Sequence, residues 1–134
     1  MEKTNIFHDI PYRREGLGRR KLAEEEHLLL MQAALKPGQG IPFHRADSNV
    51  HILVVRGKIN LDLAGEKTQA AEGDLIPVSA GTTMLISNRS GRDASFLIIK
   101  TPHPRRWRET SGRRSRTAEK PTNPKAPEPI DARR

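Results

Sequence analysis

The side chains of this sequence best suited to chemistry are its five histidines, because the sequence has no cysteine. An imidazole ring can bind a metal ion or act as an acid or base near neutral pH. His44 and His51 lie in one short segment, residues 40–57. His8, His27 and His103 have no partner at a ligand-like spacing, so we expect them on the surface. Without cysteine, disulfides and thiolate zinc sites are excluded.

Motifs for other reaction classes are missing from the sequence. Ser79 lies in VSAG and not in the Gly-x-Ser-x-Gly frame of a nucleophile elbow. The sequence has no glycine-rich phosphate-binding loop of the P-loop type either. The histidines therefore remain the candidates for a functional site.

Short extended segments must position these histidines. Residues 50–55 form a dense β-branched run that predicts a central strand, and residues 59–63 alternate between apolar and polar. Residues 67–71 predict a weaker, polar strand, and residues 95–101 predict the last strong one. Short strands separated by turn residues indicate an all-β sandwich or barrel.

Residues 22–36 allow two interpretations. Three glutamates at the start and Pro37-Gly38 at the end favour a helix. The β-structure predicted for the rest of the chain favours a strand instead. We predict a strand over Leu28–Leu35.

Residues 73–88, GDLIPVSAGTTMLISN, have the most regular spacing in the chain. Gly73-Asp74 predicts a turn between two extended runs, and Gly81 interrupts the apolar residues where the backbone needs extra freedom. Met84 lies in the second run, and Asn88 closes it. The segment therefore predicts a strand, a turn and a second strand.

The spacing of Gly73, Gly81 and Asn88 resembles the second motif of the cupin family, with Ser79 at the motif's proline and Met84 at its histidine. Residues 40–57 resemble the first motif. Together the two segments cover about residues 36–88. The resemblance implies an antiparallel double-stranded β-helix, or jelly-roll barrel, with a pocket at its mouth. Such barrels often form dimers, so a homodimer is one expected assembly.

The resemblance also implies where a metal would bind. The family's usual ligands are three histidines and one glutamate. His44 stands at the first histidine, Ala46 replaces the second and Met84 the third. His51 falls on the glutamate in one register, whereas Val50 falls there in the other. Because alternate strand residues face opposite sides, His51 points into the barrel in the first register and outward in the second.

Two functions follow from this resemblance. The first is a non-catalytic small-ligand-binding or regulatory domain, with His44, His51 and Met84 lining the pocket and no bound cofactor. The alternative is a metal-dependent enzyme of the dioxygenase or isomerase type, in which His44 and His51 hold a divalent metal ion. A thioether such as that of Met84 suits Cu(I) better than the usual first-row divalent metals.

The charge distribution divides the chain into three parts: an N-terminal arm (1–20), the barrel (21–104) and a basic tail (105–134). Residues 5–12 predict a short edge segment lying on the core, and residues 13–21 a flexible basic loop. Residues 103–134 hold ten Lys and Arg against four Asp and Glu, and so carry +6 of the net charge of +8. With four prolines and little apolar surface, the tail is predicted to be disordered and to contact polyanions weakly.

The sequence shows no membrane segment. Its N-terminus is polar and charged, and its longest apolar run, residues 28–31, is far shorter than the ~20 residues that span a bilayer. We expect a soluble cytoplasmic protein.

Overall fold

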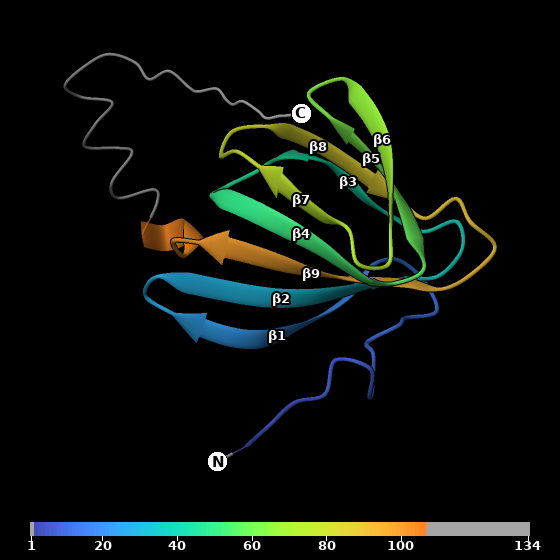
Figure 1. Cartoon of the computed structure of the whole chain (residues 1–134), viewed down its shortest axis with the longest axis horizontal. Helices are drawn as coiled ribbons and strands as arrows, with labels where there is room; N and C mark the ends of the chain where they lie inside the picture. The colour runs from blue at the N-terminus through green and yellow to red at the C-terminus, as the bar shows by residue number, and fades with distance from the viewer. Residues whose placement is uncertain (1, 107–134) are drawn as a thin grey trace.

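The structure is a computed structural model that describes residues 2–106. In this part of the chain, nine strands form two antiparallel sheets, which face each other as the two walls of a barrel (Figure 1). The five-stranded sheet has the order β1 (Gly18–Glu25), β2 (Leu28–Leu35), β9 (Ala94–Thr101), β4 (Asn49–Arg56), β7 (Leu75–Val78). The four-stranded sheet has the order β3 (Gly40–Arg45), β8 (Thr83–Ser87), β5 (Lys58–Leu63), β6 (Glu66–Ala71). The predicted all-β double-stranded β-helix is confirmed.

The core lies between the two sheets and is formed by alternate residues of their strands. Val50, Ile52 and Val54 of β4 are at most 2% exposed, and Phe96 of β9 is fully buried. Opposite them lie Ile59 and other apolar residues of the four-stranded sheet. Because only one face of each sheet can enter this core, a shift of one residue in a strand would move its buried residues to the opposite face.

The ambiguous segment 22–36 contains the end of β1, a turn and β2, which spans Leu28–Leu35 as predicted. Strand β2 pairs with β1 on one side and with β9 on the other. Ala33 and Leu35 are fully buried in the core. Tertiary packing therefore overrides the helical preference of this segment.

The glycines at 73 and 81 occupy turns, as predicted. Their φ angles are +91° and +88°, in the left-handed region that glycine adopts without strain. Between them, β7 pairs with β4 in the five-stranded sheet, whereas β8 pairs with β3 and β5 in the other. The chain thus passes from one sheet to the other at Gly81, so β7 and β8 do not form a hairpin.

The predicted flexible loop at residues 13–21 is in part a strand. Strand β1 begins at Gly18, so Arg19, Arg20 and Lys21 belong to a strand and not to a flexible loop. Arg20 donates two hydrogen bonds to Gln32 Oε1 on β2, at 2.9 and 2.7 Å. Pairing of β1 with β2 therefore orders this basic segment, which sequence composition alone marks as solvated.

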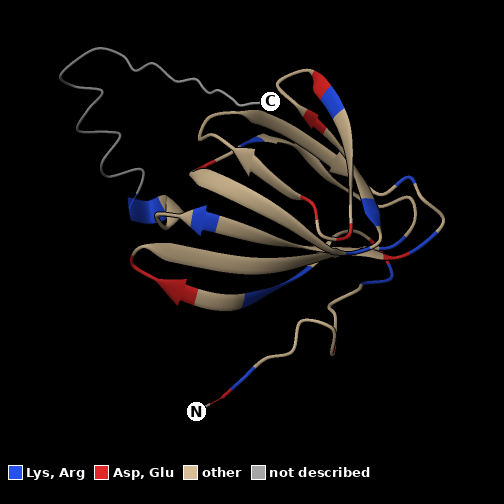
Figure 2. Cartoon of the chain, in the orientation of Figure 1, with Lys and Arg blue, Asp and Glu red and all other residues tan. Residues whose placement is uncertain are grey.

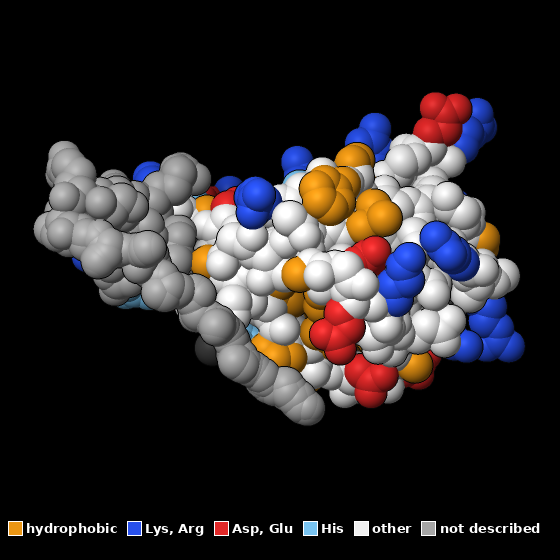
Figure 3. Space-filling view, turned by 90° about the horizontal axis from the view of Figure 1, so that it is seen from above, with side chains coloured by type: hydrophobic (Ala, Val, Ile, Leu, Met, Phe, Trp, Pro, Cys, Tyr) orange, Lys and Arg blue, Asp and Glu red, His pale blue; other side chains and the backbone are white. Residues whose placement is uncertain are grey.

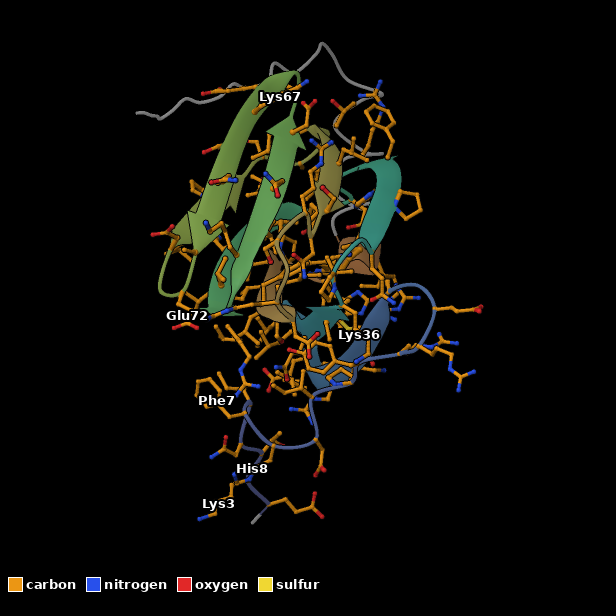
Figure 4. All side chains as sticks on the ribbon, turned by 90° about the vertical axis from the view of Figure 1, so that its right-hand side faces the viewer. Lys3, Phe7, His8, Lys36, Lys67 and Glu72 are labelled. Atoms are coloured by element: carbon orange, nitrogen blue, oxygen red, sulfur yellow. The ribbon has the colours of Figure 1, made fainter. Side chains whose placement is uncertain are left out.

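The arm lies on the outer side of the five-stranded sheet. Gln32 Nε2 donates to the carbonyl oxygen of Ile6 at 2.9 Å and to Ser95 Oγ at 2.9 Å. The predicted edge segment is thus a set of turns held by hydrogen bonds, and Phe7 is 51% exposed. In Figure 4, Phe7 and His8 lie below the barrel, on the side opposite Lys67 of the β5–β6 hairpin.

The end of the described chain folds back onto the β1–β2 hairpin. His103, which we expected on the surface, is only 9% exposed, and its Nε2 lies 2.8 Å from Glu24 Oε2. Arg106 lies 3.4 Å from Glu26. Figure 2 shows these acidic and basic ends side by side. His8 and His27 are exposed, as predicted.

Two further predictions concern the C-terminal tail and membrane-spanning segments. The predicted disorder and polyanion contacts of the tail fall, from residue 107 onward, outside the described residues. Within residues 2–106, no helix is long and apolar enough to cross a membrane.

Candidate functional site

A cavity of about 300 Å³ opens between the two sheets, on the side where β1 and β3 are the edge strands. Strands β2, β9, β4 and β8 supply most of its walls. Most of the lining is apolar, and the polar side chains are few. The lining residues are Leu17, Arg19, Leu29, Met31, Ala33, Ile41, His44, Ala46, Asp47, Val50, Ile52, Met84, Ile86, Ile98 and Lys100.

Strand alternation explains the apolar walls. Leu29, Met31 and Ala33 face the cavity from β2, at every second position. Val50 and Ile52 do so from β4. These inward positions carry no polar side chain, so the centre of the cavity can solvate a charge only poorly.

His44 lines the cavity, and the position of its hydrogen follows from its hydrogen bond. Its Nδ1 lies 2.9 Å from the carbonyl oxygen of Pro42. Because a carbonyl oxygen can only accept, Nδ1 carries the hydrogen and donates it. In the neutral ring, Nε2 then has a free lone pair that can accept a hydrogen bond or bind a metal. His44 is otherwise exposed.

Met84 and Ala46 lie beside His44 in the cavity wall. His44 and Met84 are directly paired across β3 and β8, so the structure brings these two predicted site residues together. Met84 is 4% exposed and Ala46 is 6% exposed. The backbone N–H of Ala46 donates to the Thr82 carbonyl at 2.8 Å, and its carbonyl accepts from Gly81. The loop that follows Gly81 thus fixes the position of Ala46.

His51 does not line the cavity, which corrects its assignment to the ligand pocket and, with His44, to a metal site. Its neighbours Val50 and Ile52 face inward, and alternation turns His51 to the outer face of the five-stranded sheet. There it is half-buried and pairs with Pro77 and Ile99. The structure therefore has the register in which Val50, and not His51, points into the barrel.

The charged residues of the cavity come from positions that the sequence did not single out. Lys100 Nζ lies 3.0 Å from Asp47 Oδ1, and both residues line the cavity. Arg19 of β1 lines it as well, opposite Ala33 of β2. The spacing of Lys100 from Ile98 could have indicated that Lys100 faces inward. Arg19 had no such signal, because β1 was predicted as a loop.

The donor set of the cavity does not fit a divalent first-row metal ion. Such an ion prefers several imidazole or carboxylate ligands. Here His44 supplies one imidazole, Met84 a thioether, and the carboxylate of Asp47 is paired with an ammonium group. Among residues 2–106, no group of three or more His, Cys, Asp or Glu could hold a metal ion.

Few large hydrophobic side chains of the described chain are exposed. In the face shown in Figure 3, hydrophobic side chains lie singly or in small groups among charged and polar ones. The large hydrophobic residues exposed on the described chain are Phe7, Phe43, Leu75 and Leu85. Phe43 and Leu85 lie on the paired strands β3 and β8, and a small hydrophobic group of this kind is normal for a protein surface.

With the barrel and its cavity described, comparison with known proteins identifies the family. Residues 31–100 match the model of the cupin domain, so this chain belongs to the cupin family. An uncharacterized protein of Methanocaldococcus jannaschii is 30% identical over 87 residues, which are 64% of this chain and 75% of that protein.

Solved structures agree with this assignment. The crystal structure of an RmlC-like cupin family protein with a double-stranded β-helix fold, from M. jannaschii, has a TM-score of 0.68 and 27% identity. The match covers 78% of this chain and 94% of that one. The structure of the TT1209 protein from Thermus thermophilus has a TM-score of 0.70 and 22% identity, over 76% of this chain and 98% of the other. At 22% identity the likeness shows the fold alone.

Proposed function

We propose that this cupin is a non-catalytic binding module, which holds a small and mainly apolar molecule in its barrel. The observation that carries the proposal is the wall beside His44. Ala46 and Met84 are buried there, at positions that carry histidine in cupins with a bound metal, and they give the wall apolar surface in place of two imidazoles. Apolar walls with a few polar groups are the usual composition of a small-ligand site.

The size of the cavity agrees with this proposal. Its volume of about 300 Å³ lies at the lower end of the range of ligand pockets, ~300–1,000 Å³. His44 supplies a hydrogen-bonding group at the wall, and Arg19, Asp47 and Lys100 supply charged ones. A small molecule with an apolar body and a polar end would satisfy both kinds of surface.

One observation favours the alternative, a metal-dependent enzyme with an abbreviated site. The bond from His44 Nδ1 to a backbone carbonyl orients the ring in the way common to metal-binding histidines. Nε2 would then be the ligand atom. This alternative requires further ligands from outside this chain, such as water or substrate.

Restoring histidines distinguishes the two functions. We expect protein purified without a histidine tag to bind zinc and nickel negligibly. The double variant Ala46→His/Met84→His should bind them clearly, because it places three imidazoles around one point. Calorimetric titration measures the affinity. At a hundredfold excess of metal over Kd, the variant should gain about 2.7 kcal/mol of folding stability.

A control variant tests whether the metal affinity depends on the position of the new histidines or only on their number. Thr68→His/Leu75→His introduces two imidazoles at exposed positions of different sheets, and should gain no such affinity. If the natural protein holds stoichiometric metal that His44→Ala releases, the enzyme alternative replaces our proposal. If Ala46→His/Met84→His folds but binds nothing, the three positions do not converge on one point.

A further inference from the structure

We infer that the ligand of this cavity is a small amphipathic monocarboxylate, whose carboxylate binds Arg19 and whose apolar body lies along the walls formed by β2, β4 and β8. The inference rests on the proposed function and adds the chemical class of the ligand. It follows from the charges around the cavity, the spacing between them and the volume that they enclose.

Among the charged residues that line the cavity, Arg19 differs from the others in that its side chain has no partner among the described residues. Lys100 is neutralised by Asp47 at 3.0 Å. The guanidinium of Arg19 makes no hydrogen bond or ion pair within residues 2–106. The cavity therefore carries one positive charge that no described residue compensates. A guanidinium presents a planar fork that matches a carboxylate with two parallel hydrogen bonds.

The paired and unpaired charges lie at opposite ends of the cavity. Arg19 is opposite Ala33 on β2, whereas Lys100 is opposite Leu29. Ala33 and Leu29 are four residues apart, which is about 13 Å along a strand. Met31, which lines the cavity, lies between them. A ligand held by its carboxylate at Arg19 would thus lay its body on apolar surface before it reached the second charged pair.

The cavity volume sets the size of the ligand. A volume of about 300 Å³ corresponds to about ten water molecules, at roughly 30 Å³ each in the liquid. The ligand should therefore have about ten non-hydrogen atoms. A carboxylate with a chain of six to eight carbons, or a phenyl ring on a short acid, is of this size.

The methionines provide a direct assay. The chain has three, and two of them, Met31 and Met84, line the cavity. In protein labelled with ¹³C at the methionine methyl groups, octanoate should shift the signals of Met31 and Met84, which the variants Met31→Leu and Met84→Leu identify. From butanoate to octanoate, each further buried methylene should tighten binding about fourfold.

Charge specificity is tested with octanol and two variants. Octanol offers the same chain without the carboxylate, so it should bind the natural protein at least about tenfold more weakly than octanoate. Arg19→Gln should abolish that difference and leave octanol binding unchanged. Arg89→Gln removes the same charge from an exposed loop residue and should alter neither affinity.

The outcomes separate this inference from the proposed function. If octanol shifts the signals of Met31 and Met84 as strongly as octanoate does, the ligand does not need a carboxylate. The proposed function, binding of an apolar molecule, would then remain supported. If octanoate binds but Arg19→Gln binds it equally well, Arg19 is not the carboxylate site. If neither compound shifts the two signals, this inference fails. If neutral fragments of similar size also fail to shift them, the proposed function fails with it.

Discussion

The two faces of the five-stranded sheet have different compositions and different tasks. The inner face carries Val50, Ile52 and Phe96, which are almost completely buried against the other sheet and in part line the cavity. The outer face carries Leu53 and Leu97, half-buried, and the polar Gln32 and Ser95, which are fully buried beneath the N-terminal arm. One face is held by apolar packing, the other largely by hydrogen bonds.

This difference teaches that burial alone does not identify the core of this barrel. Gln32 is as buried as Phe96, but all of its hydrogen-bonding groups have partners: Arg20, Ile6 and Ser95. A buried polar group is tolerated when it is fully hydrogen-bonded. The arm supplies one of these partners, so it completes the outer face as the second sheet completes the inner one.

The largest expected effect comes from truncating the inner face. Phe96→Ala should lower the free energy of unfolding by about 3–5 kcal/mol, because it leaves a cavity in the core. Leu97→Ala, one residue further on the outer face, should cost only about 1 kcal/mol. Urea denaturation of both variants measures the difference. A cost for Leu97→Ala equal to that of Phe96→Ala would mean that another surface, such as the predicted second protomer, covers the outer face.

A smaller effect should follow from breaking the hydrogen bonds beneath the arm. Gln32→Leu keeps a side chain of similar size but leaves the Ile6 carbonyl without its donor and removes one of the acceptors of Arg20, which still donates to the carbonyls of Asn5 and Asp9. We expect a loss of about 1–3 kcal/mol and faster proteolysis of residues 2–17. The matched control, Gln69→Leu, makes the same change at an exposed position of β6 and should cost little. Unchanged proteolysis of Gln32→Leu would show that other contacts hold the arm.

The smallest effect concerns the edge of the same sheet, where His103, near the end of the described chain, contacts Glu24 of β1. Hydrogen bonds from Lys21 and then from His103 lower the pKa of Glu24 to about 2. Because this pKa lies below its usual value of 4.5, the contact contributes stability above about pH 4.5, and this contribution is lost as the pH falls toward 2. Glu24→Gln should therefore flatten the stability profile over this window.

The size of this pH effect should be small because Glu24 is exposed to solvent. Thermal melts between about pH 2 and pH 6 provide the measurement. Glu66→Gln, at the tip of the β5–β6 hairpin, removes a carboxylate that forms no ion pair within the described residues, and should preserve the natural profile. A profile equally steep in Glu24→Gln and in the natural chain would show that the contacts of Glu24 do not contribute to stability.

The assignment of His51 shows where sequence reasoning reached its limit. In β4, both alternating sets of residues are largely apolar: Val50, Ile52 and Val54 form one set, and His51, Leu53 and Val55 the other. Either set could form a core, so the pattern leaves the register open. The pairing of β4 with β7 and β9 decides it, because these contacts turn Val50 to the inside.

The sequence by itself determined the all-β fold and the turns at Gly73 and Gly81. These features depend on local properties, namely β-branched runs, turn residues and the backbone freedom of glycine. Only the tertiary structure decided which histidine reaches the cavity, that Arg19 lies in its wall and that Lys100 pairs with Asp47. These features join residues far apart in the chain, and no local pattern specifies which strands become neighbours.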